Sequence, residues 1–113
     1  MKKILFVFLL ICLALGTAYA HPPKDIEISY DPATKILTAT ILHDTNNPLG
    51  HYIEKVDIGL NGQEIIEQKI SRQENINSQE VNYYISDTNP EDKLSVEGYC
   101  SISGKLRKEI VVK

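Results

Sequence analysis

The sequence predicts an all-β domain, a seven-stranded immunoglobulin-like sandwich or barrel. After residue 20, apolar and polar residues alternate with a period of two, the pattern of half-buried strands. Turn residues separate these runs at the intervals typical of a β-sandwich. No run with the helical period stands out between them. We therefore expect residues 21–113 to form a single small domain built from short strands.

A secretory signal peptide is predicted over residues 1–20. Two lysines precede an apolar run over residues 4–15, which is short for a membrane span, and Ala18-Tyr19-Ala20 provides small residues at the cleavage positions. We expect cleavage after Ala20, a mature chain that begins at His21, and a periplasmic or secreted location without membrane insertion after cleavage. Cys12 would leave with this leader.

A turn, a polar loop and a hairpin separate the first four predicted strands. Asp31-Pro32-Ala33-Thr34 ends the first strand, in which every second residue is apolar. A polar loop over residues 43–50 separates the second strand from the third. Asn61-Gly62, the strongest short hairpin signal, joins the third strand to the fourth. We place these strands at residues 26–30, 35–42, 51–60 and 63–70.

The last three predicted strands follow a polar loop over residues 71–78. The fifth ends at Asp87-Thr88-Asn89-Pro90, and Gly104 permits a turn before the seventh. We place these strands at residues 80–85, 94–102 and 108–112. The chain after residue 20 has neither Trp nor Phe. Ile, Leu, Val and five Tyr residues are therefore expected to fill the core.

Charge and cysteine spacing exclude several function classes. The chain has 12 Lys and Arg against 15 Asp and Glu, and loss of two leader lysines makes the mature domain more acidic. Such a surface argues against nucleic acid or anionic lipid as a partner. There is no CxxC pair, so a zinc ribbon or thioredoxin-like motif is excluded. Neighbouring carboxylates such as Glu54 and Asp57 are interpreted as solvated surface.

Three histidines and one cysteine are the candidate chemistry of the domain. Imidazole nitrogen and thiolate sulfur are ligands that suit transition metals. His43 continues the parity of the second strand just past its end, and His51 opens the third strand. Cys100 faces inward near a sheet end, and His21 precedes the first strand. These positions predict a metal site at one end of the sandwich. Cys100 can also be a buried inert thiol or form an intermolecular disulfide.

The same residues carry a resemblance to a known family. The segment from His43 to Ile53, His-x7-His-Tyr-Ile, resembles the HP…HYI segment of superoxide reductases, the iron-binding domain of desulfoferrodoxin and neelaredoxin. The segment 98–104 resembles the C-N-x-H-G segment of that family, and His21-Pro22-Pro23 resembles its H-x-P element. The resemblance implies that residues 21–113 form a desulfoferrodoxin-like β domain, a seven-stranded immunoglobulin-like barrel.

For the metal, the resemblance implies mononuclear non-haem iron held by four histidines and an axial cysteine. Carried over by position, the metal ligands are His21, His43, His51 and Cys100. Ser103 stands where the family has its fourth histidine. A Glu-Lys pair that attracts superoxide in the family would fall at Tyr19-Ala20, inside the predicted leader.

The implied activity is the reduction of superoxide to hydrogen peroxide, with an external electron donor. Copper is the alternative ion, because a free His21 α-amino group beside its imidazole chelates Cu(II), and copper binds more tightly than iron in the Irving–Williams order. Two further interpretations stay open, a non-catalytic periplasmic protein that binds iron or copper and a metal-free immunoglobulin-like binding module. The sequence assigns no catalytic residue, decides neither enzyme status nor oligomeric state, and offers superoxide or a metal ion as the partner.

Overall fold

The computed structural model describes residues 21–113, which form seven strands and no helix. The predicted all-β fold class is therefore confirmed. The strands are β1 (Asp25–Asp31), β2 (Ile36–Leu42), β3 (Ile53–Leu60), β4 (Gln63–Lys69), β5 (Ser78–Tyr84), β6 (Lys93–Cys100) and β7 (Lys105–Val111). The predicted signal peptide and Cys12 lie outside the described residues. Within residues 21–113 no helix is long and apolar enough to cross a membrane.

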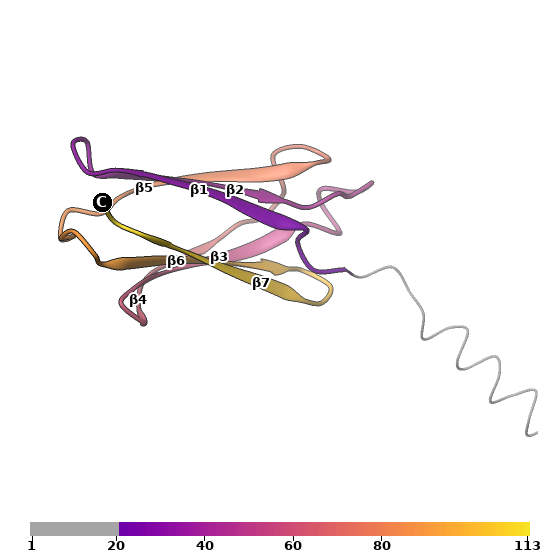
Figure 1. Cartoon of the computed structure of the whole chain (residues 1–113). Helices are drawn as coiled ribbons and strands as arrows, with labels where there is room; N and C mark the ends of the chain where they lie inside the picture. The colour runs from indigo at the N-terminus through magenta and orange to yellow at the C-terminus, as the bar shows by residue number, and fades with distance from the viewer. Residues whose placement is uncertain (1–20) are drawn as a thin grey trace, which may run out of the picture.

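Two antiparallel sheets pack face to face as an immunoglobulin-like sandwich (Figure 1). The smaller sheet has the order β1-β2-β5 and the larger one the order β4-β3-β6-β7. In constant-type immunoglobulin domains the fourth strand extends the sheet of the fifth, whereas here β4 pairs with β3. Contacts between the sheets close both open sides: Tyr83 Oη donates to Gln68 Oε1 at 2.6 Å, and Lys108 Nζ pairs with Asp25 Oδ1 at 3.0 Å.

Turn chemistry explains where the strands begin and end. The Asn61-Gly62 hairpin is confirmed, and both residues have the positive φ that a two-residue turn of this kind requires, 51° and 86°. The third strand begins at residue 53 instead of 51, because a turn precedes it in which the Gly50 and His51 amides both donate to Asn47 O. The last strand begins directly after Gly104, three residues earlier than expected.

The core is aliphatic. Its members come from the inward-facing positions of the strands and neighbouring loops: Ile26, Leu37, Ala39, Ile41, Ile53, Val56, Ile58, Val81, Ile85, Leu94, Val96 and Val112. The expectation that tyrosines fill the core is wrong. Tyr30 and Tyr83 pack against the core but are only partly buried, and Tyr84 is exposed. A Tyr hydroxyl needs a hydrogen-bond partner when buried, so the margin of the sandwich suits these side chains.

Candidate metal centre

The three histidines lie together at one end of the sandwich. His21 precedes β1, His43 follows β2 and His51 precedes β3, so three separate segments supply them. The ring centroids are 5.0 Å apart for His21 and His43, 4.9 Å for His21 and His51, and 4.7 Å for His43 and His51. One ring nitrogen of each histidine lies within 4.8 Å of the other two. The segments therefore converge on a cluster of three imidazoles.

His43 is the buried anchor of this cluster. Its position continues the alternation of Leu37, Ala39 and Ile41, which turns its side chain into the sandwich, and it is 0% exposed. Its backbone amide donates to Asn77 O at 2.9 Å, which prolongs the β2–β5 pairing by one step. The ring Nδ1 lies 2.9 Å from Gln73 Oε1. The ring Nε2 is buried and has no hydrogen-bond partner among the described residues.

His51 presents a second buried and unpartnered ring nitrogen. Its Nε2 makes no hydrogen bond to any described residue. Burial lowers the pKa of this imidazole, and the positive charge of His43 and His21, when they are protonated, lowers it further. The ring is therefore held neutral at pH 7, the protonation state that a metal ligand requires.

His21 is exposed and is positioned by contacts of its neighbours. The Lys24 amide donates to Leu42 O at 2.7 Å, and Lys24 Nζ pairs with Asp44 at 2.7 Å. Both contacts hold the segment before β1 against the end of β2, next to His43. That ion pair lowers the pKa of Asp44. Gly104 passes directly beneath Pro22, so close that an added Cβ would lie 3.0 Å from the Pro22 Cα. These contacts bring His21 over the other two imidazoles.

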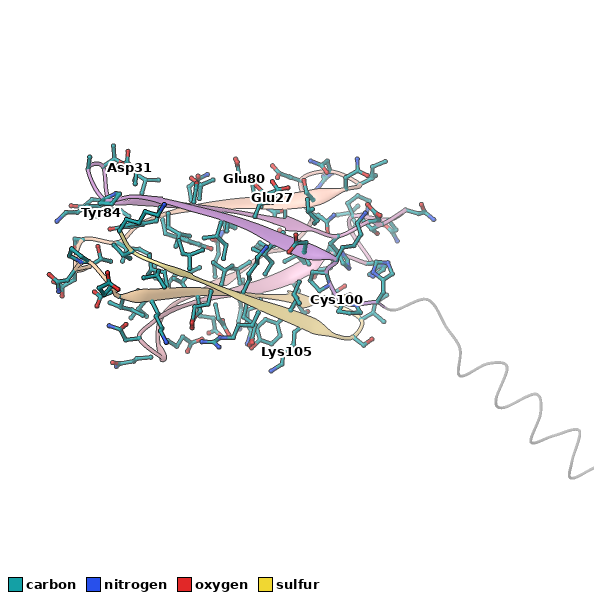
Figure 2. The ribbon with its side chains drawn as sticks, in the orientation of Figure 1. Glu27, Asp31, Glu80, Tyr84, Cys100 and Lys105 are labelled. Carbon is teal, nitrogen blue, oxygen red and sulfur yellow. The ribbon has the colours of Figure 1, made fainter. Side chains whose placement is uncertain are left out.

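Cys100 lies at the same end of the sandwich but outside this group of ligand atoms. It is the last residue of β6, opposite Ile53, and its side chain is 5% exposed and forms no disulfide within residues 21–113. Figure 2 places it near the point at which the described chain begins, far from Tyr84. The ligand atoms that lie within 4.8 Å of one another are nitrogens of the three histidines, and the Sγ of Cys100 is not among them. Ser103 is exposed.

The histidine cluster has the chemistry of an incomplete transition-metal shell. Nitrogens bound about 2.0–2.1 Å from one ion lie at most about 4.2 Å apart, so the cluster needs only small side-chain adjustments to hold one. Neutral imidazoles suit Zn, Cu, Fe and Ni. Three protein ligands leave positions on the ion for water or a substrate.

Two features of this structure were not predicted from the sequence. Gln73 is fully buried against His43, although it sits in a polar loop that gives no sign of that role. Asp57, Glu64 and Glu67 form a second group of close ligand atoms across β3 and β4. Lys55 already pairs with two of these carboxylates, with Asp57 at 3.6 Å and with Glu67 at 3.3 Å, so we interpret this group as an ion-pair network around the half-buried Asp57, whose Oδ1 has no hydrogen-bond partner among the described residues.

No protein-family model matches the chain, and no curated protein matches it.

Proposed function

We propose that this protein binds one transition-metal ion through His21, His43 and His51. The observation that carries the proposal is the fully buried His43 Nε2, which lacks a partner among the described residues and lies in a cluster of three imidazoles. A buried polar atom without a hydrogen bond costs about 1–3 kcal/mol, and coordination of an ion would remove that cost. The unpartnered Nε2 of His51 supports the same proposal.

The donor set is compatible with both ions expected from the sequence. Iron follows from the resemblance to superoxide reductases, and copper follows from its higher affinity for nitrogen ligands. Chelation of copper by the α-amino group and Nδ1 of His21 would have to break the contact of that Nδ1 with Pro22 O, now 3.2 Å. Binding through Nε2 preserves this contact. We propose a periplasmic or secreted location because a signal peptide is predicted over residues 1–20.

The test is metal loading of protein that begins at His21, purified reduced and anaerobically and then titrated with Fe(II) or Cu(II). We expect about one ion per chain, measured by mass spectrometry, and loss of binding in His43→Gln and His51→Gln. Glu67→Gln is the control, because it alters the other cluster of ligand atoms and should leave binding unchanged. A wild-type protein that binds neither ion would refute the proposal and favour a metal-free immunoglobulin-like module.

Superoxide reductase activity is a second candidate, favoured by the place of Cys100. Cys100 has a buried thiol and is the last residue of β6. It pairs with Ile53, the first residue of β3, which lies two residues after His51. A shift of that strand end that brought the thiolate to the ion would add a further ligand. Bound Fe(II) would supply one electron to superoxide, which takes up two protons and leaves as hydrogen peroxide, and an external donor would restore the electron.

This second candidate has its own experiment. Iron-loaded protein is exposed to a pulse of superoxide, and superoxide loss and the visible absorption of the oxidised iron are followed together. We expect consumption faster than spontaneous dismutation, a thiolate-to-iron absorption band, and loss of that band in Cys100→Ser. Retained iron with neither the band nor faster consumption would reject the enzyme and keep the metal-binding protein.

A further inference from the structure

Gln73 is the one fully buried side chain of an otherwise exposed loop. The residues on both sides of it, 71–72 and 74–77, are exposed, whereas Gln73 is 0% exposed. Burying an amide is costly unless it is hydrogen-bonded. The position of this side chain therefore needs specific partners, and two of its four hydrogen bonds go to His43.

Every hydrogen-bonding position of the Gln73 amide is used. Its Nε2 donates to His43 O at 2.7 Å and to Asn75 O at 2.9 Å. Its Oε1 accepts from the Ile53 amide at 3.2 Å and contacts His43 Nδ1 at 2.9 Å. A glutamine amide has two donors and one oxygen with two acceptor positions. The reversed orientation would set its NH2 group against the Ile53 N–H and its oxygen against two carbonyls, so the orientation is fixed.

The fixed orientation determines the tautomer of His43. Because Gln73 Oε1 is an acceptor only, His43 Nδ1 has to carry the proton and donate it. In a neutral imidazole the other nitrogen, Nε2, then holds the free lone pair. That nitrogen is the buried and unpartnered atom of the cluster.

We propose that Gln73 is the positioning residue of the metal centre, which holds His43 in the Nδ1–H tautomer with its Nε2 lone pair presented to the ion. The inference rests on the proposed metal binding. The backbone of Gln73 adds a second constraint, since its amide donates to Pro48 O at 3.0 Å, inside the loop between His43 and His51. One residue thus joins the end of β2, this loop and the start of β3. Partners of this kind fix ring orientation and typically change metal affinity about 10- to 100-fold when they are removed.

The test combines the tautomer in the metal-free protein with metal affinity. Nitrogen NMR of the imidazoles, recorded above their ordinary pKa of about 6.5, should show His43 protonated at Nδ1 in the wild type. Gln73→Leu should lose this uniform tautomer and weaken Fe(II) or Cu(II) binding about 10- to 100-fold. Gln79→Leu is the matched control, because Gln79 bonds the backbone of the same loop, at Glu74 N, without touching a histidine.

The outcomes separate this inference from the proposed function. A wild-type His43 protonated at Nε2 would overturn the role of Gln73, whether or not metal binds, and this result needs no variant to fold. Equal affinity and tautomer in wild type and Gln73→Leu would overturn it as well. If the wild type shows the Nδ1–H tautomer but takes up neither ion, the proposed function fails while the assignment of the tautomer stands.

Discussion

Replacing Gly104 with alanine should displace His21 while the sandwich stays folded. Gly104 has a φ of 88°, and a Cβ built there would lie 2.9 Å from Pro22 Cβ and 3.0 Å from both its Cα and N. Carbon atoms in contact normally lie about 3.5–4.0 Å apart, so Pro22 has to move by about 0.5–1 Å. Pro22 is exposed and near the start of the described chain, so it can move without disturbing the core.

Gly62 provides a control that separates backbone strain from this contact. Its φ is 86°, almost the same as that of Gly104, but a Cβ there would meet no atom within 4 Å. Both substitutions force alanine into the left-handed region, which costs about 1–2 kcal/mol. We therefore expect similar losses in the free energy of unfolding for Gly104→Ala and Gly62→Ala, measured by denaturant titration of the metal-free proteins.

Metal affinity should distinguish the two variants. Metal–ligand distances have to hold within about 0.2 Å, and a shift of about 0.5–1 Å in the residue after His21 exceeds that tolerance. We expect Gly104→Ala to weaken Fe(II) or Cu(II) binding about 10-fold or more, measured by competition with a chromophoric chelator, and Gly62→Ala to bind like the wild type. Equal affinities in the two variants would show that the contact between Gly104 and Pro22 does not position a ligand.

Three further predictions concern the fold and its charges. Ile58→Ala should cost about 2–5 kcal/mol in the free energy of unfolding, because Ile58 is fully buried in β3; a loss below about 1 kcal/mol would argue against its place in the core. Burial raises the pKa of Tyr83 to about 12, so its phenol should titrate near pH 12 by ultraviolet absorbance, and a titration midpoint near 10 would contradict the burial. The stability that the neutral phenol contributes should be complete below about pH 10, its pKa in the unfolded chain, and should fall as the pH rises through 12. Tyr83→Phe should remove this pH-dependent component. Lys24→Met should raise the pKa of Asp44 in an NMR titration, and an unchanged carboxyl pKa would mean that the ion pair does not form in solution. Because the pair is exposed, the same substitution should change the free energy of unfolding by at most about 1 kcal/mol.

Strand parity and turn chemistry were readable from the sequence because they depend on neighbours along the chain. Alternation along residues 37–41 predicts a buried face and carries His43 inward on the same side. Asn61-Gly62 predicts a hairpin, because both positions require the positive φ that these residues tolerate. The approach of His43 and His51 follows in part from the same logic, since one short loop joins them at one end of the sandwich.

Only the tertiary structure decided which distant segments meet. The alternation of β4 and β5 does not say which sheet each strand joins, yet that choice places β5 beside β2 and brings the loop between β4 and β5 to the histidine end. Gln73 reaches His43 across 30 positions of sequence, and Gly104 lies against Pro22 although the two residues are near opposite ends of the described sequence. Such contacts depend on how the two sheets pack as a whole. A period-two pattern specifies the face of each strand but not its neighbours, so the candidate histidines were visible in the sequence and the contact of Gln73 with His43 was not.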